Sequence, residues 1–414
     1  MRHSSDAASR SGRGLDGVNF FVAAVQTGFG SFVTVYLVKN QWPPEAIGFA
    51  LTIATTSTLV SQIPAGAALD STRDKRWPVM LGIVGVGLAA LLLCVTAARP
   101  AVYLALAMQG LASSLIGPGI AAISLALVGQ AGMSERVGRN ARFASIGNGL
   151  AAAAMGVAGS SLPVLTVFLI SATLAIPALL SLSLISGDYQ RPTDAPGEAE
   201  TRISWEGAKS VFLNKQLSIF AACVLLFFAA SAAMGPGLAG QVTRHWPDYA
   251  TLIVAAIILV PQVIVAAISP WIGRRAETSG RRPLMLVGWA LIPLQGLVYA
   301  MLLPSPLAWV FGSLLNAFSG AIFGVMMTVV AADLTRKTGG FNLTLGALGV
   351  AVAVGASLST FFTGVSATAI GVRGAAIGLA LVGMCGLMLL WSAMPETRPA
   401  QAKLPTPDNT PTGR

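Results

Sequence analysis

The sequence is poor in charged residues. They make up only 10% of the 414 residues, whereas hydrophobic residues make up 54%. A soluble protein carries roughly a quarter charged residues, so this deficit excludes an ordinary soluble domain and indicates a chain surrounded by lipid. The net charge of +10 does not indicate nucleic-acid binding, because no basic soluble domain exists to carry it.

Histidine, cysteine and buried acids are also scarce. His3 lies near the start and His245 in a connection, no acid lies deep in a hydrophobic segment, and Gly-x-Ser-x-Gly is absent. A membrane enzyme needs such groups within the membrane, so an enzyme is only a distant alternative. Cys94, Cys223 and Cys385 lie far apart and indicate neither a disulfide framework nor a metal site. We expect no cofactor and no metal.

Long hydrophobic segments are what the sequence has instead. A helix that crosses a bilayer needs about 20 mostly apolar residues. In lipid the backbone must satisfy its own hydrogen bonds, so each segment is expected to be a helix. Twelve segments qualify: 17–38, 46–69, 78–98, 101–129, 141–160, 162–186, 216–241, 249–272, 283–303, 306–332, 342–368 and 371–393.

A connection rich in proline and acids divides these segments into six and six. The predicted organisation is a leader (1–16), a first six-helix bundle (17–186), a linker (187–215), a second bundle (216–394) and a disordered tail (395–414). If the N-terminus is cytoplasmic, the inner connections hold 22 of the 26 lysines and arginines. Positively charged loops stay in the cytoplasm, so we expect a multi-pass protein of a bacterial inner membrane with both termini, linker and tail inside.

One motif occurs twice, at the end of the second and of the eighth hydrophobic segment. Gly66 is followed by Asp70, and 207 residues later Gly273 is followed by Glu277. A basic cluster comes after each acid, with Arg73, Lys75 and Arg76 in the first copy and Gly280, Arg281 and Arg282 in the second. This pattern resembles the signature loop of the major facilitator superfamily of membrane transporters, although Arg73 stands where that family usually has glycine.

The same offset relates other parts of the two halves. Gln109, Ser113 and Gly117 correspond to Asn316, Gly320 and Gly324. The resemblance covers about residues 16 to 395 and implies two pseudo-symmetric six-helix bundles with a substrate site between them. It implies transport of a small molecule by alternating access, with protons as a candidate coupling ion. The transporter is expected to be a monomer in contact with membrane lipid. A channel is disfavoured, because the repeat places one site between two halves.

The resemblance also implies a cytoplasmic gate. In the family the acid of the first copy lies against the N-terminal end of the eleventh helix, whose dipole attracts an anion. Here that end is expected near Gly339 to Asn342. The expected gate residues are Gly66, Asp70, Arg73, Lys75, Arg76, Gly273, Glu277, Gly280, Arg281 and Arg282.

Two acids at helix ends are candidates for proton coupling. Asp16 stands at the start of the first segment and Asp333 at the inner end of the tenth. Many proton-driven members of the family bury a charge in the first or fourth helix, and this sequence has Leu106 where an arginine would precede Gln109. Simple capping of the helix ends is the alternative role for both acids.

The polar residues inside the segments are neutral. An amide that faces lipid leaves its hydrogen bonds unmade, so these residues should bond between helices or line a cavity. The candidate cavity residues are Asn19, Gln26, Gln109, Gln262, Gln295 and Asn316, of which Gln26, Gln109 and Asn316 are favoured. Such a cavity suits a neutral or amphipathic solute. Gly147 and Gly156 match the opening of a glycine motif found in the family's exporters, which favours efflux, with an importer or uniporter as the alternative.

Overall fold

The structure is a computed structural model that describes residues 2–29, 31–163, 165–186, 214–234, 250–303, 305–336 and 339–398. Every regular element within these ranges is an α-helix. Eight of the helical stretches found there are long and apolar enough to cross a membrane. The predicted all-α membrane fold is therefore confirmed.

The helices of the two halves follow in chain order. The first half contains α1 (Arg2–Thr27), α2 (Ser31–Lys39), α3 (Pro44–Ser71), α4 (Arg76–Val95), α5 (Arg99–Ser161) and α6 (Leu165–Ser183). The second contains α8 (Lys215–Ser231), α10 (Ala250–Ser279), α11 (Arg281–Leu302), α12 (Pro306–Thr335) and α13 (Phe341–Ala393). The linker at 187–213 and the end of the predicted seventh span lie outside the described residues.

Two of these helices each contain two predicted spans. α5 is 63 residues long, which at about 1.5 Å per residue is roughly twice the thickness of a bilayer. Its direction changes at Gly129, where φ is 64°, and α13 changes direction at Gly371, where φ is 77°. Glycine adopts such positive φ values without steric cost. The turn between the predicted spans 101–129 and 141–160 is therefore made by a single glycine, and residues 130–140 that follow it are helical.

The first span also differs from its prediction. Helix α1 begins at Arg2, so most of the predicted leader is helical, and Leu15 is fully buried. The predicted single span 17–38 is divided into α1 and α2, and the Phe29 N–H closes a turn onto the Gln26 carbonyl between them. The glycine-rich sequence around Phe29 explains the interruption, because glycine weakens a helix interior.

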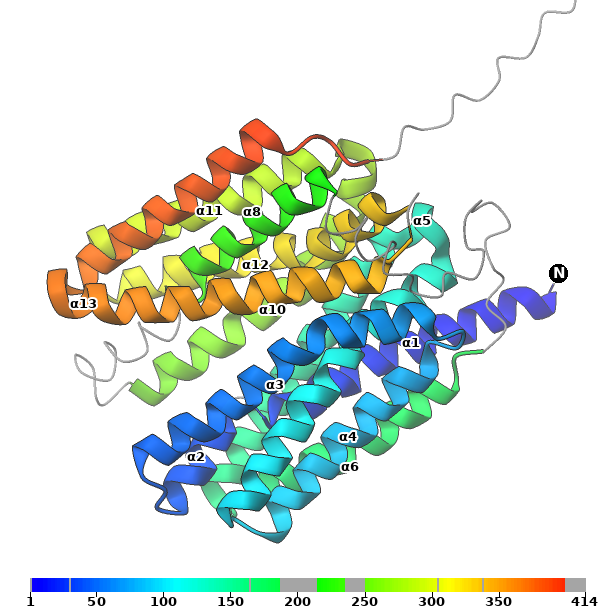
Figure 1. The fold of residues 1–414 in the computed structure, drawn as a ribbon, viewed down its shortest axis with the longest axis horizontal. Coiled ribbons are helices and arrows are strands. Elements are labelled where there is room, and N and C mark those ends of the chain that lie inside the picture. Colours follow the sequence, from blue (N-terminus) through cyan, green and yellow to red (C-terminus); the bar gives the residue numbers. More distant parts are fainter. Residues whose placement is uncertain are drawn as a thin grey trace, which may run out of the picture.

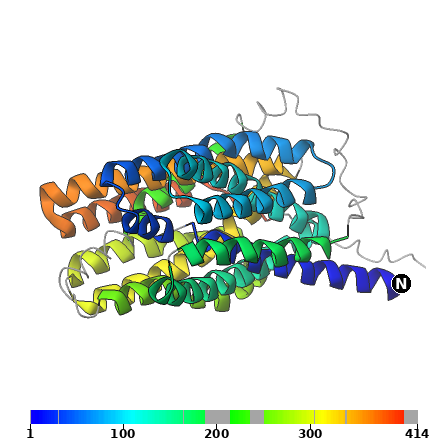
Figure 2. The same cartoon turned by 90° about the horizontal axis from the view of Figure 1, so that it is seen from below.

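The two halves form two bundles that lie side by side (Figure 1). One end of the molecule carries α1's N-terminus, the ends of α3, α10 and α13, and the basic side chains. We call it the basic end, and it is defined by Lys75, Arg76, Arg136, Arg139, Arg281 and Arg282. In Figure 1 the bundles approach each other toward the basic end and diverge toward the opposite end, and Figure 2 shows α1 extending beyond its neighbours there.

Packing follows the same division. The largest group of buried side chains centres on the second half, where Phe227, Trp289 and Phe323 pack with ring centroids 4.5–5.7 Å apart. Met133 and Val137 belong to α5 of the first half but are buried in this second-half group. The two bundles therefore share a packed interface near the basic end.

Candidate functional site

The acid of the first motif lies against the start of α13. The Asp70 carboxylate accepts hydrogen bonds from the Asn342 N–H (3.1 Å), the Asn342 side-chain amide (2.8 Å) and the Leu343 N–H (2.9 Å). Backbone N–H groups at a helix N-terminus have no partner within the helix, and the helix dipole is positive there. Asp70 thus occupies the end at Gly339 to Asn342 where the family resemblance placed it.

Glycines bring α3 and α13 into backbone contact beside Asp70. A side-chain carbon at Gly66 would overlap the Asn342 carbonyl, and one at Gly346 would overlap the Gln62 carbonyl. Each helix therefore supplies one glycine to the crossing. On each helix this glycine comes four residues after the residue whose carbonyl the glycine of the other helix contacts. Only glycine permits this approach.

The second half of the repeat builds a matching crossing between α10 and α5. A side-chain carbon at Gly273 would overlap the Ser134 carbonyl, and one at Gly138 would overlap the Ser269 carbonyl. The glycine of each motif copy thus contacts the opposite bundle. The repeat seen in the sequence appears in space as two crossings between the halves, both near the basic end.

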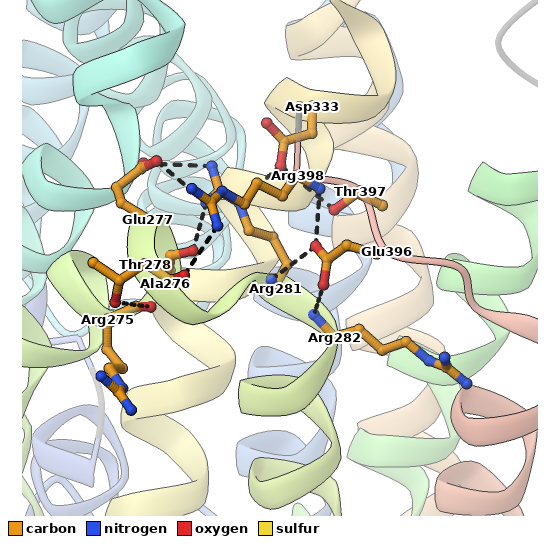
Figure 3. Close-up of polar contacts among 10 residues, drawn as sticks. All are labelled: Arg275, Ala276, Glu277, Thr278, Arg281, Arg282, Asp333, Glu396, Thr397 and Arg398. Atoms are coloured by element: carbon orange, nitrogen blue, oxygen red, sulfur yellow. Dashed lines mark hydrogen bonds and ion pairs between the residues drawn. The ribbon is translucent and has the colours of Figure 1, made fainter. Parts of the chain in front are cut away.

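The acid of the second motif behaves differently. Glu277 lies in the last turns of α10 and pairs with Arg281, with oxygen–nitrogen distances of 3.3 and 3.4 Å. Arg281 is almost fully buried, and its Nε also pairs with Asp333 at 3.0 Å. Figure 3 shows Arg281 between the two acids. The second copy therefore holds α10, α11 and α12 together within one half.

A third acid completes this cluster. The Glu396 carboxylate accepts from the Arg281 N–H (2.8 Å) and the Arg282 N–H (3.0 Å), and so caps the N-terminus of α11 (Figure 3). Partial burial acts to raise the pKa of Glu396, but its hydrogen bonds from backbone N–H groups outweigh burial and lower it. The first residues of the predicted disordered tail (395–414) are thus fastened to the bundle by Glu396, and residues 399–414 lie outside the described residues.

The basic residues near the first motif hold the loop between α3 and α4. Lys75 Nζ lies 2.6 Å from the Leu69 carbonyl and 2.7 Å from the Thr72 carbonyl, at the C-terminus of α3. Arg76 pairs with Asp74 at 2.7 Å, and this hydrogen bond lowers the pKa of Asp74. Arg73 lies in the same loop, and Gly280, with φ of 90°, makes the corresponding turn before α11.

The coupling candidate Asp16 is buried between two arginines. Its carboxylate lies 2.6 Å from Arg136 Nη2 and 2.5 Å from Arg139 Nη2. Arg136 is also buried, and it donates to Asn140 at 2.8 Å. These contacts join α1 to α5 at the basic end. Asp16 and Asp333 are thus both ion-paired there, each within its own half.

Two of the favoured amides meet in the first half. Gln26 on α1 and Gln109 on α5 donate to the same Ser113 hydroxyl, at 3.4 and 2.9 Å. One residue farther along α1, Thr27 donates to the Asn148 side-chain carbonyl at 3.0 Å. All five side chains are partly exposed. They form two neutral, partly exposed sets of contacts between α1 and α5.

The stripe of small residues faces open space in both halves. Atoms added at Gly117, Gly320 or Gly324 would meet nothing within 4 Å, and Asn316 is exposed. Gln262 on α10 is partly exposed and lies beside Gly149 of the other half, at 3.6 Å from the carbon that an alanine there would add. These positions can line a path between the bundles.

Two predicted cavity residues do not reach that path. Gln295 is 1% exposed inside the second half, where it donates to the Tyr299 hydroxyl at 3.2 Å. Asn19 is 8% exposed and donates to the Leu15 carbonyl of its own helix at 2.7 Å. In this structure both side chains lie away from the path, because the helix face that a polar residue occupies is set by packing. The list of predicted cavity residues did not include Ser113, which bonds to Gln26 and Gln109, or Asn148, which bonds to Thr27. Ser113 could have been found from its spacing, because it lies four residues after Gln109 on the same helix face.

Comparisons with known proteins agree with this geometry. The family model of the Major Facilitator Superfamily matches residues 15–292. The chain belongs to the major facilitator superfamily. Proteins of Mycobacterium tuberculosis from two strains, each described as an uncharacterized MFS-type transporter, are 33% identical over 396 residues, which is 94% of this chain and 94% of each relative.

Solved structures share the fold at low sequence identity. FucP, the Escherichia coli fucose:proton symporter, in its outward conformation has a TM-score of 0.70 at 14% identity and covers 91% of this chain and 97% of its own. The human organic anion transporter MFSD10 has a TM-score of 0.68 at 14% identity, with 93% and 98% covered. These structures show the shared fold, while the family model and the relatives that are 33% identical show that the protein is a transporter and not an enzyme.

Proposed function

We propose that this transporter exports a small neutral or amphipathic solute across the cytoplasmic membrane. The observation that carries the proposal is the neutral cluster of Gln26, Gln109 and Ser113, whose side chains are partly exposed. The small-residue stripe at Gly117, Gly320 and Gly324 supports the proposal, because a side-chain carbon added at any of them would meet nothing within 4 Å.

The placement of charge supports a neutral solute. A phosphate or dicarboxylate would call for arginine or lysine side chains in the path. The buried arginines of the described residues, Arg136 and Arg281, instead lie at the basic end and are paired with acids. Amides and hydroxyls both donate and accept hydrogen bonds, which suits a solute with a polar edge and an apolar body.

Orientation and direction are part of the proposal. Positively charged connections favour a cytoplasmic location for the basic end and for both termini, so the bundles meet on the cytoplasmic side. Support for export comes from Gly147, where a side-chain carbon would overlap the Phe20 carbonyl of α1. This close contact between α1 and α5 fits the glycine motif of the family's exporters.

The direct test is transport by purified protein in liposomes, across a panel of neutral, cationic and anionic compounds and with or without a pH gradient. We expect efflux of neutral or amphipathic compounds, measured from right-side-out vesicles. Exclusive transport of organic anions or of phosphorylated compounds would contradict the neutral site. Uptake in the opposite direction would contradict export alone.

A further inference from the structure

The crossing of α5 and α10 has a pattern that the transport site does not use. On each helix a serine precedes a glycine by four residues, Ser134 and Gly138 on α5 and Ser269 and Gly273 on α10. Each glycine contacts the carbonyl of the other helix's serine. We call these four residues the hydroxyl seam. Since α5 and α10 belong to different bundles, the seam must part whenever the basic end opens.

The two serine hydroxyls of the seam are buried without partners. Ser134 and Ser269 are both 0% exposed, and neither Oγ has a hydrogen-bond partner among the described residues. Buried serines elsewhere show the usual solution: Ser124 donates to the Ile120 carbonyl at 2.7 Å, and Ser319 to the Gly288 carbonyl at 2.8 Å. A hydroxyl that is buried without a partner loses its hydrogen bonds to water and gains none within the protein, which costs free energy.

The other crossing has the same spacing and a different energy balance. Gln62 and Gly66 on α3 face Asn342 and Gly346 on α13. Here Asp70 receives three N–H groups, so closure makes charge-assisted hydrogen bonds. Closure of the basic end therefore gains three hydrogen bonds at α3–α13, although Asn342 Oδ1 and Thr344 Oγ1 are buried there without partners among the described residues. At α5–α10 it leaves two hydroxyls unsatisfied and gains no such bonds to a charged group.

We propose that Ser134 and Ser269 are positioning residues for the conformational cycle, which favour opening of the basic end and so balance the Asp70 contact. When the bundles part, water reaches both hydroxyls and restores their hydrogen bonds. A group that is better satisfied in one state shifts the population toward that state. Removal of the hydroxyls should shift the equilibrium toward the closed basic end, whichever solute is carried.

A buried thiol can report this equilibrium. Val137 on α5 is 6% exposed and packs in the group of buried residues centred on the second half. Val137→Cys, in a chain whose Cys94, Cys223 and Cys385 are replaced by alanine, would react with a polar methanethiosulfonate reagent only when the bundles separate. The reaction rate of the purified protein then follows the open fraction, because opening is fast relative to modification at low reagent concentration.

In this background Ser134→Ala with Ser269→Ala should slow modification about five- to tenfold, and each single change should give part of the effect. Gly273→Ala should have the opposite effect and speed modification, because its side chain would overlap the Ser134 carbonyl and force the seam apart. At Gly378 on α13 an added side-chain carbon would meet nothing within 4 Å, so Gly378→Ala should leave the rate unchanged.

Ser171→Ala is the matched control. The Ser171 hydroxyl is also 0% exposed and unpartnered, but it lies on α6 near Gly28, within the first half. This variant should gain thermal stability without a change in the modification rate. The proposal is overturned if the seam serine pair leaves the rate unchanged or raises it. It is also overturned if Ser171→Ala slows modification equally, since the effect would then be general stabilisation.

Discussion

At the scale of single residues, the contact of Asp70 with α13 is the feature most open to test. Asp70→Asn removes the charge that faces the helix dipole and weakens three hydrogen bonds. Such a charge contributes about 0.3–1 kcal/mol when exposed and up to ~2 kcal/mol when partly buried. We expect faster modification of the thiol at Val137→Cys and lower transport, with normal membrane insertion.

Asp74→Asn provides the control for this prediction, because Asp74 lies four residues after Asp70, in the loop that follows α3, and pairs with Arg76 and not with α13. Glu277→Gln should act more mildly than Asp70→Asn, since Glu277 makes only the longer contacts to Arg281. Unchanged accessibility in Asp70→Asn would refute the gate role.

Substitution of two glutamines, Gln26 and Gln295, should have different effects on transport and on stability. Gln26→Leu should change apparent affinity or substrate range at near-normal expression, because Gln26 is partly exposed where it contacts Ser113. Gln295→Leu should instead alter thermal stability and leave affinity unchanged, because Gln295 is buried beside Tyr299. Transport kinetics and melting temperature of both variants check this prediction, and the reverse assignment of effects would show it to be wrong.

The two candidate coupling acids should also differ. Asp16→Asn leaves Arg136 buried without its acid, and breaking a buried pair costs about 3–5 kcal/mol. Asp333→Asn still leaves Glu277 beside Arg281. If coupling runs through Asp333, its variant should lose accumulation against a gradient and keep exchange, whereas Asp16→Asn should mainly lower the melting temperature. Gradient-driven transport that survives in the double variant would exclude both acids.

At the scale of elements, the structure shows how a short segment fixes the start of a helix. Glu396 caps α11 from beyond the end of α13, while Arg282 donates to the Trp391 carbonyl at 2.5 Å. The N-terminus of α11 and the C-terminus of α13 therefore lie side by side. The segment thus fastens α13 to α11 and, through Arg281, to α12.

This clamp predicts a pH dependence. The pKa of Glu396 is lowered in the folded protein, so the clamp contributes stability above the ordinary carboxyl pKa, and that contribution is lost as pH falls through the lowered value. Glu396→Gln should therefore lower the melting temperature at neutral pH, and its difference from the unmodified protein should vanish in strong acid. A difference that persists in acid would mean that Glu396 acts through packing and not through its charge.

At the scale of the whole molecule, the basic end is predicted to face the cytoplasm. Cysteine labelling or reporter fusions should place residues 74, 200, 278 and 400 inside the cell, and residues 41, 99, 245 and 371 outside. Labelling from both sides of the membrane, with a permeant reagent as the positive control, decides each position. An outside signal from the linker at 187–213 would contradict the arrangement of six helices on each side of it.

The sequence by itself determined the class, the repeat and one long-range contact. Hydrophobic length requires helices in lipid, and the family resemblance of the repeated motif implied that Asp70 lies against the start of α13. The class and the repeat could be read because they depend on local composition and on a pattern present in two copies, whereas the contact came from the resemblance. A signal that occurs twice at one offset limits the arrangements that the chain can adopt.

Tertiary structure alone decided which groups meet. The pairing of Asp16 with two arginines and the Glu396 clamp join positions that no sequence spacing relates. The burial of Gln295 likewise depends on packing of the whole bundle. Gln26 and Gln295 are alike as sequence, and the rotation of each helix within its bundle opens one to the path and buries the other. That rotation is set by side-chain packing over the whole bundle, which is why the sequence predicted the helices and the structure assigned their faces.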